Sequence, residues 1–196
     1  MPSDPKGRLI ALEGASGLDL SNVGAKLARQ LVKPRQEGGV SRFDASGIFF
    51  ELRKGEKNIP QPSPRTLLLL YAADLVFRLR WEIKPALEEG YVVVAAPYVD
   101  SAIAFGKAAG LPRRWLAELF SFAPKPATSY RLKEKKDIGN WKFKRSEGYL
   151  EFCCKTLLKS SPIWQPVDLR EKYLLYLESL EKRGDCETVS DRILGR

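Results

Sequence analysis

The residues best suited to chemistry form a glycine-containing segment near the N-terminus, Gly14-Ala15-Ser16-Gly17-Leu18-Asp19-Leu20-Ser21. An apolar stretch at residues 8–13, typical of a buried strand, precedes it, and a helical pattern runs from Ser21 to Val32. A glycine loop between a strand and a helix can bind phosphate, because its N–H groups and the helix N-terminus present positive potential to the phosphate oxygens. The order of elements therefore indicates a phosphate-binding loop.

This segment departs from the phosphate-binding motif GxxxxGK[ST] at its charged position. Gly14 and Ser21 are in register with the motif, but Asp19 replaces the second glycine and Leu20 replaces the lysine. A carboxylate would face the phosphates, and no ammonium remains to hold them. Ser21 can serve as a ligand of Mg²⁺ or phosphate, or as a helix N-cap, and the acidic Asp19 beside it favours the cap.

The elements that must position this segment alternate between apolar runs and longer helical patterns, which indicates an α/β domain with a mostly parallel sheet. The clearest buried strand is expected at residues 91–96, and the longest helix runs from Pro64 to Glu89 with a kink near Pro85. A turn is expected at Gly38-Gly39. The shorter elements are an amphipathic stretch at 43–52, helices at 101–109, 112–122, 149–158 and 169–180, and strands at 127–132 and 163–167.

Bulk composition limits the classes of function. The 196 residues, 44% of them hydrophobic, suit one domain over 1–196, with a core at about 8–183 and a frayed tail at 184–196. The chain has no histidine, which excludes imidazole bases and histidine metal ligands. A net charge of +9 suits phosphorylated ligands, nucleic acid or an acidic partner, and is equally compatible with an inert basic surface.

Location and redox state follow from the same composition. No stretch reaches the roughly 18 consecutive apolar residues of a membrane span, and the first residues lack the apolar core of a secretion signal. We therefore expect a cytoplasmic protein that has no membrane partner. The three cysteines have no metal-type spacing, which predicts reduced thiols and no metal site.

Several motifs, in order, resemble the thymidylate kinase family of nucleoside monophosphate kinases. Leu12-Glu13-Gly14 resembles the FEG that opens that family's loop, and Glu37-Gly38-Gly39 is similar to its EPGG. The further matches are Leu69–Asp74 on LLFAADR, Ile83–Gly90 on IxPALxxG, Val93–Ser101 on VISDRYVDS, Pro124-Lys125-Pro126 on PxPD, and Trp164–Asp168 on the final strand. The resemblance implies a three-layer P-loop NTPase-like fold with about five mostly parallel strands flanked by helices. It also implies a lid at residues 133–145 and a homodimer built on the long helices.

The chain departs from this family at five charged positions. The loop lysine falls on Leu20, the acidic loop residue on Ser16, and the arginine of AADR on Leu75. The Asp-Arg pair of DRY falls on Ala96-Pro97, and the aspartate of PxPD falls on Ala127. Phosphoryl transfer depends on positioning and charge neutralisation, so the loss of the lysine and two arginines predicts little transfer activity.

The remaining candidate residues each have a functional and a structural interpretation. Arg78 is a possible substitute cation one turn beyond Asp74, and the lid offers Lys133, Lys135, Lys136, Lys142 and Arg145, although most such charges are simply solvated. Tyr71 corresponds to the aromatic residue that stacks on thymine in the family, or it packs in the core. Tyr98 lies near the expected monophosphate ribose, so Tyr71, Asp74, Arg78 and Tyr98 outline a possible nucleoside pocket.

Three functions stay open at this point. The first is a catalytically degenerate member of the resembled family that keeps its architecture for binding a nucleotide or a partner. The second is a weak kinase that uses ATP and Mg²⁺ to phosphorylate dTMP with displaced cations. The third is a basic interaction module for nucleic acid or protein; for nucleic acid it is the least supported, because no interleaving of aromatic and basic residues is visible.

Overall fold

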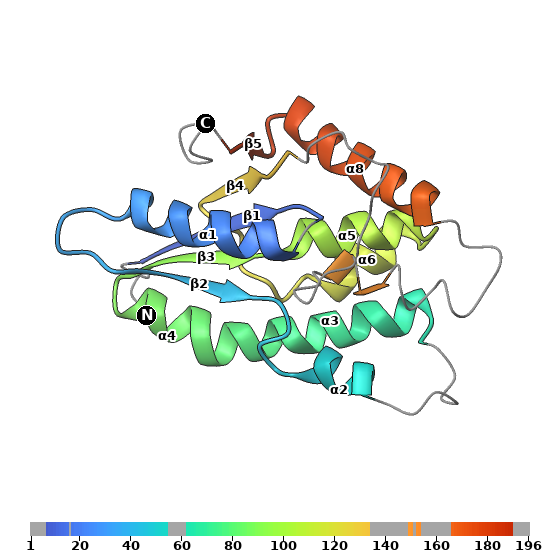
Figure 1. Ribbon diagram of the computed structural model, residues 1–196, viewed down its shortest axis with the longest axis horizontal. Coiled ribbons are helices and arrows are strands. Elements are labelled where there is room, and N and C mark those ends of the chain that lie inside the picture. Colours follow the sequence, from blue (N-terminus) through green and yellow to red (C-terminus); the bar gives the residue numbers. More distant parts are fainter. Residues whose placement is uncertain are drawn as a thin grey trace.

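A five-stranded parallel sheet forms the centre of the structure, a computed structural model that describes residues 7–15, 17–54, 62–133, 149–150, 152–153 and 166–189 (Figure 1). The strand order is β2-β3-β1-β4-β5, and each neighbouring pair is parallel. The strands are β1 (Arg8–Glu13), β2 (Gly38–Arg42), β3 (Val92–Ala96), β4 (Thr128–Arg131) and β5 (Glu187–Thr188). The predicted α/β class and the parallel sheet are confirmed.

Helices cover both faces of the sheet, which explains why the central strands are apolar on both sides. One face packs against α1 (Gly17–Leu31). The opposite face carries α3 (Pro64–Arg78), α4 (Lys84–Glu88), α5 (Val99–Ala108) and α8 (Pro166–Lys182), while α2 (Ile48–Lys54) and α6 (Arg113–Leu119) lie further out. Along β1, Ile10 and Leu12 join the core under α1, whereas Leu9 and Ala11 join the larger core under the other helices.

Prolines mark the start of the long helix and the irregular turn within it. Ser63 caps α3, since its hydroxyl accepts a hydrogen bond from the Thr66 N–H at 3.2 Å, and Pro64 occupies the first turn. Between α3 and α4 lies a π-helical turn, η1 (Leu79–Ile83). Pro85 has no N–H and would clash with the carbonyl of Trp81 in a regular α-helix, so the wider π turn accommodates it. The predicted kink is therefore a local widening just before the proline.

Two sequence predictions about the sheet are wrong. Gly38-Gly39 is not a turn but the start of β2, which pairs with Val92 and Val93. A β-carbon on Gly38 would lie 2.7 Å from Val32 Cγ1, so the glycine permits close packing there.

The last strand also lies elsewhere than predicted. Residues 166–167 of the expected strand begin α8, and residues 163–165 lie outside the described part of the chain. The tail predicted to be frayed instead contains β5, and the Val189 N–H donates to the Arg131 carbonyl at 2.9 Å. A strand of two residues is too short to produce an apolar run in the sequence. In the described ranges, no helix combines the length and apolar character needed to cross a bilayer.

Candidate active site

The loop after β1 is shorter than a phosphate-binding motif requires. Helix α1 begins at Gly17, so residues 17–20, which the motif would wrap around a phosphate, form the first helical turn. Ser21 therefore lies inside the helix, and its predicted role as N-cap is wrong. Ser16 lies outside the described residues.

Leu20, at the position of the motif lysine, belongs to the hydrophobic core. It is 1% exposed and packs in the core beneath α1, together with Leu12, Leu27 and Leu132. A β-carbon built on Gly14 would lie 3.1 Å from Leu20 Cδ2, which means that the leucine side chain covers the glycine. The space beside Gly14 is therefore occupied by carbon, where the motif places an ammonium group.

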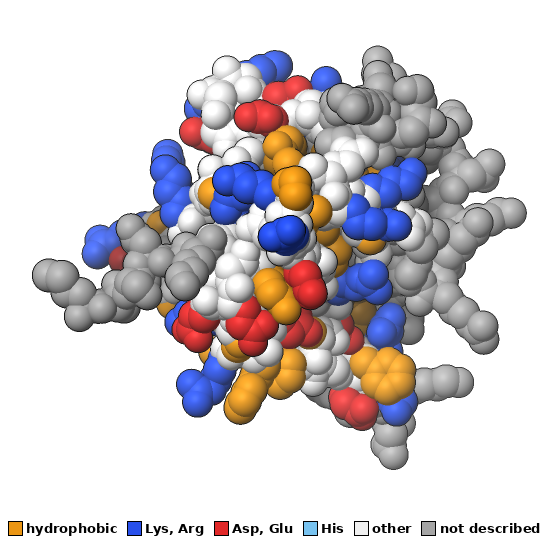
Figure 2. Space-filling view, turned by 90° about the vertical axis from the view of Figure 1, so that its left-hand side faces the viewer, with side chains coloured by type: hydrophobic (Ala, Val, Ile, Leu, Met, Phe, Trp, Pro, Cys, Tyr) orange, Lys and Arg blue, Asp and Glu red, His pale blue; other side chains and the backbone are white. Residues whose placement is uncertain are grey.

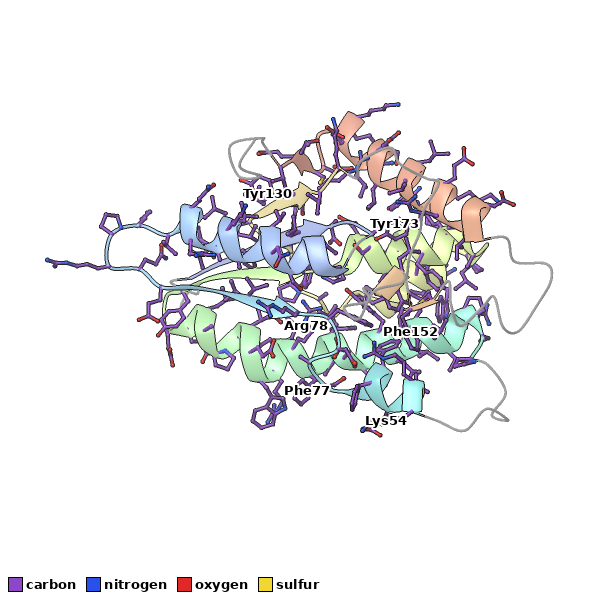
Figure 3. The ribbon with its side chains drawn as sticks, viewed as in Figure 1. Lys54, Phe77, Arg78, Tyr130, Phe152 and Tyr173 are labelled. Atoms are coloured by element: carbon purple, nitrogen blue, oxygen red, sulfur yellow. The ribbon has the colours of Figure 1, made fainter. Side chains whose placement is uncertain are left out.

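The backbone of Gly14 is held by two other elements. Its carbonyl accepts a hydrogen bond from the Tyr173 hydroxyl of α8 at 2.6 Å, and its N–H faces Ser101 Oγ of α5 at 3.4 Å. Tyr173 is buried at this point (Figure 3). These contacts join the start of the loop to the helical layer on the other face of the sheet.

Glu13 is a fully buried carboxylate that the search for site residues in the sequence missed. Its oxygens accept hydrogen bonds from the N–H groups of Tyr98 (3.2 Å), Asp100 (3.1 Å) and Ser101 (3.0 Å), and from the Ser101 hydroxyl. It thereby satisfies the free N–H groups at the start of α5. Burial, and secondarily the charge of Asp100, raises the pKa of Glu13 to about 7. The sequence feature that could have identified Glu13 is its position as a charged residue directly at the end of an apolar strand.

Arg78, the predicted substitute cation, is buried and bonded to the backbone. Its Nε donates to Ser41 Oγ at 2.9 Å, one terminal nitrogen donates to the Ser41 carbonyl at 2.7 Å, and the other donates to the Pro97 carbonyl at 2.9 Å. Figure 3 shows it on the side of α3 that faces β2. Arg78 therefore joins α3 to the ends of β2 and β3, with three of its five N–H groups used in these contacts.

Asp74, also in the predicted pocket, holds the turn before α2. It is fully buried, and its carboxylate accepts hydrogen bonds from the N–H groups of Asp44 (3.2 Å) and Ser46 (2.9 Å) and from the Ser46 hydroxyl (2.8 Å). All of these donors come from residues 43–47, which connect β2 to α2. The carboxylate thus acts as a local anchor of the chain.

Tyr71 is part of a buried aromatic cluster. Its hydroxyl donates to the Tyr98 carbonyl at 2.6 Å, and its ring centroid lies 4.4 Å from that of Tyr149 and 6.1 Å from those of Phe43 and Phe120. Burial raises the pKa of the Tyr71 hydroxyl well above its ordinary value. The structure supports the second interpretation of Tyr71, packing in the core, because other side chains already cover its ring.

Of the other predicted residues, Tyr98 lies next to Tyr71, because its carbonyl accepts the hydrogen bond from the Tyr71 hydroxyl. Tyr98 is buried, and its hydroxyl donates to the Pro124 carbonyl at 2.8 Å. Lys133 is exposed and pairs with Glu181 of α8 at 3.4 Å. The remaining predicted lid residues, Lys135, Lys136, Lys142 and Arg145, lie outside the described part of the chain.

Together these elements define the class of protein. A parallel sheet in the order β2-β3-β1-β4-β5, with a glycine segment and a helix directly after the central strand β1, is a P-loop NTPase-like fold. Residues 40–151, more than half of the chain, match the family described as thymidylate kinase. The chain therefore belongs to the thymidylate kinase family, as its motifs predicted.

Individual relatives agree with this assignment. The chain is 36% identical over 118 residues to a probable thymidylate kinase of Pyrobaculum calidifontis, a match that covers 60% of this chain and 59% of the relative. It is 35% identical over 80 residues to one of Caldivirga maquilingensis (41% and 38%), and 45% identical over 58 residues to one of Pyrococcus abyssi (30% and 28%). The chain thus spans less than two thirds of the length of these relatives.

Proposed function

We propose that this protein is a catalytically degenerate member of the thymidylate kinase family that keeps the family's architecture for binding a ligand or a partner. The observation that carries the proposal is the burial of Leu20 in the core beneath α1, at the position of the phosphate-binding lysine. A neutral side chain there cannot neutralise the charge that develops on a transferring phosphoryl group. We also place the protein in the cytoplasm, which is compatible with the buried thiols of Cys153 and Cys186.

The positions of the other charged groups support the same proposal. The guanidinium of Arg78 is engaged with Ser41 and Pro97, and Pro97 itself stands where the family has an arginine. Loss of a single arginine at the transferring phosphate costs roughly 10³–10⁵ in rate in well-studied phosphoryl-transfer systems. Loss of the lysine and two arginines therefore leaves little phosphoryl transfer.

A turnover and binding assay on the full chain tests this proposal. ADP formation is measured with ATP, Mg²⁺ and dTMP, and thermal unfolding is followed with dTMP alone, with ATP and Mg²⁺, and with both. We expect no ADP above the background without enzyme. A rise in the unfolding midpoint with dTMP alone would identify a retained nucleotide ligand. Steady ADP formation that depends on dTMP would contradict the proposal and make the protein an active nucleoside monophosphate kinase.

We further propose that the chain forms a homodimer through the outer side of α3 and η1. Large apolar residues lie exposed there at helical spacing: Leu69, Val76, Phe77 and Trp81, the last 64% exposed. Phe77 points away from the sheet in Figure 3, and hydrophobic side chains gather on the lower part of the face in Figure 2. An exposed apolar stripe of this kind is typical of an interface.

The homodimer is tested by sedimentation of the wild type and two matched variants. Phe77→Asp should convert the dimer to a monomer, because it buries a charge in the contact. Leu175→Asp serves as the control, since Leu175 is 56% exposed on α8, away from the stripe. A wild type that sediments as a monomer, or a dimer unchanged by Phe77→Asp, would contradict this interface.

A further inference from the structure

Three positively charged side chains come from three different helices to the neighbourhood of Tyr176 in α8. Lys107 lies in the last turn of α5, Arg113 is the first residue of α6, and Arg183 directly follows α8. The three helices are neighbours, since α5 packs along α8 and also contacts α6 (Figure 1). None of these four residues falls in the motifs that resemble the family, so their charges need another explanation.

The ammonium group of Lys107 is held in place by an aromatic ring instead of a carboxylate. Its nitrogen lies 3.9 Å from the centroid of the Tyr176 ring, which is the geometry of a cation–π interaction. Within the described ranges, neither Lys107 nor Arg113 forms an ion pair with a carboxylate. Burial, followed by the charges of Arg113 and Arg183, lowers the pKa of Lys107, and the charge of Asp100 acts in the opposite direction. Two cations thus repel this ammonium where one carboxylate attracts it.

The hydroxyl of Tyr176 experiences the same set of charges. Burial, followed by the charge of Asp100, raises the pKa of Tyr176, whereas the charges of Arg183 and Arg113 act in the opposite direction. Both arginines therefore lie close to this side chain, one on the side of α8 and one on the side of α6. Lys107, Arg113 and Arg183 consequently form one group of cations around a single ring.

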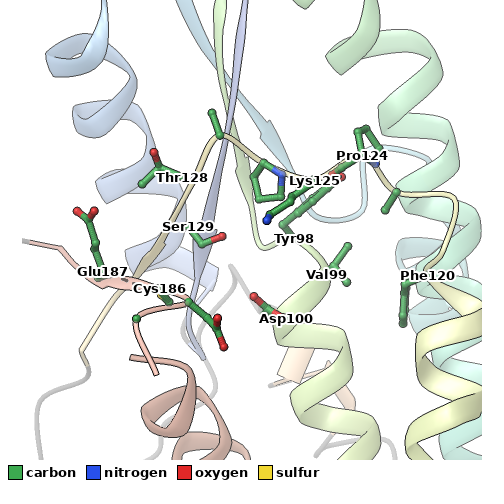
Figure 4. A pocket seen from close by; sticks show the side chains of 15 residues that line it. Tyr98, Val99, Asp100, Phe120, Pro124, Lys125, Thr128, Ser129, Cys186 and Glu187 are labelled. Atoms are coloured by element: carbon green, nitrogen blue, oxygen red, sulfur yellow. Dashed lines mark hydrogen bonds between the residues drawn. The ribbon is translucent and has the colours of Figure 1, made fainter. Parts of the chain in front are cut away.

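The nearby carboxylates line a neighbouring hollow, whereas the cations do not. Asp100 and Asp185 belong to the walls of a hollow of about 530 Å³ between the start of α5, β4 and the connection from α8 to β5 (Figure 4). Asp185 also pairs with the guanidinium of Arg183 at 3.1 Å. Lys107, which is half-buried, and Arg113, which is exposed, do not line the hollow. Their positive charge can therefore meet an anion outside it.

We propose that Lys107, Arg113 and Arg183 bind the diphosphate group of a small molecule on the outer surface of α5, α6 and α8. The guanidinium of Arg113 presents paired N–H groups that fit two phosphate oxygens, and the ammonium of Lys107 supplies a point charge that the ring already positions. A compact group with several negative charges fits cations gathered around one side chain, whereas an extended nucleic acid is fitted by a basic stripe. The diphosphate can be inorganic or the phosphate tail of a nucleotide. The site does not depend on the proposed loss of catalysis.

Calorimetric titration of the full chain with inorganic pyrophosphate at low ionic strength tests the proposal. We expect pyrophosphate to bind, and its affinity to fall as salt is added, because the cations are partly or fully exposed. Acetate, which carries a single charge, should bind at least about tenfold more weakly. No binding of pyrophosphate up to millimolar concentration, or equal binding of acetate, would overturn the proposal.

A parallel titration with ADP identifies the source of the diphosphate group. Equal affinities for ADP and pyrophosphate would show that the diphosphate group alone is recognised, and a higher affinity for ADP would identify a nucleotide as the ligand. Either result supports the site only if Lys107→Met weakens the binding of both compounds, since ADP bound at the family motif would not respond to this variant.

Single-charge variants locate the binding. Lys107→Met and Arg113→Gln should each weaken pyrophosphate binding about tenfold, because each removes one charge-assisted contact. Arg114→Gln is the matched control: it removes the same charge from the next position of α6, where Arg114 is 91% exposed and pairs with Glu118 at 2.9 Å, and it should bind like the wild type. Asp100→Asn should tighten the binding, since it removes the carboxylate that opposes an anion. Equal loss in Arg113→Gln and Arg114→Gln, or weaker binding in Asp100→Asn, would refute the site.

Discussion

The buried carboxyl of Glu13 should make the stability of this protein depend on pH in a range where few other groups titrate. Burial raises its pKa from 4.5 to about 7 in the folded state. The chain has no histidine, so no imidazole titration overlaps this range. The perturbation that isolates the effect is Glu13→Gln, which keeps an acceptor oxygen for the N–H groups at the start of α5 and removes the titration.

The sign and size of the effect follow from the two pKa values. Because the folded-state pKa is the higher one, the folded protein keeps its proton at pH values where the unfolded chain has already lost it. The free energy of unfolding therefore falls as the pH rises through the folded-state pKa. One pKa unit corresponds to about 1.4 kcal/mol, so the difference between 4.5 and about 7 is worth about 3 kcal/mol in full. Most of this is lost between about pH 5 and about pH 8.5.

Urea unfolding followed by tryptophan fluorescence at a series of pH values measures this loss. The wild type should lose about 2–3 kcal/mol more than Glu13→Gln across that range. Asp100→Asn should shift the wild-type transition to lower pH, because it removes the second cause of the raised pKa. Glu118→Gln, an exposed control, should follow the wild type. Parallel curves for the wild type and Glu13→Gln would refute the reasoning, since they would show that the carboxyl has the same pKa in both states.

Variants at three further positions test the roles that the structure gives these side chains. Leu20→Lys should lower the free energy of unfolding by about 2–4 kcal/mol in urea titration without producing ADP formation, whereas Leu20→Met, which conserves volume, should cost less than about 1.5 kcal/mol. Arg78→Lys should cost about 3 kcal/mol, because one ammonium cannot reach Ser41 and Pro97 together; a loss below about 1 kcal/mol would contradict the bridging role. Tyr71→Phe should cost about 1–2 kcal/mol by leaving the Tyr98 carbonyl unpaired, and an unchanged midpoint would refute that hydrogen bond.

Most of the fold was predictable because its strands and helices have local sequence patterns. Residues 91–96 form a continuous apolar run, and that run is β3, buried on both faces. The two edge strands, β2 and β5, have no such local pattern. Gly38–Arg42 carries two glycines and one apolar residue, and Glu187–Thr188 is too short for any pattern, so both depend on pairing with a neighbouring strand. The start of α1 was missed for a related reason, since the glycine motif suggested a loop where the chain already turns into a helix.

The candidate site was less predictable, because burial and long-range partners decide what its charged residues do. Asp74 and Arg78 are ordinary polar residues on a helix in the sequence, yet the first bonds to the turn before α2 and the second bonds to Ser41 and Pro97. Glu13 bonds to residues 85 and more positions away. No local pattern contains that information.

At the family motif, charged residues are replaced and other side chains fill the space around them. Restoring a single charged residue is therefore not expected to produce phosphoryl transfer. Leu20 covers Gly14, Arg78 bonds to the backbone at the position of a lost arginine, and Tyr149 packs against the ring of Tyr71. Each of these groups now contributes to packing or hydrogen bonding in the folded state. A lysine placed at position 20 would therefore meet a packed core. Under the proposed loss of catalysis, we expect turnover to require that the helix start at Gly17 opens as well.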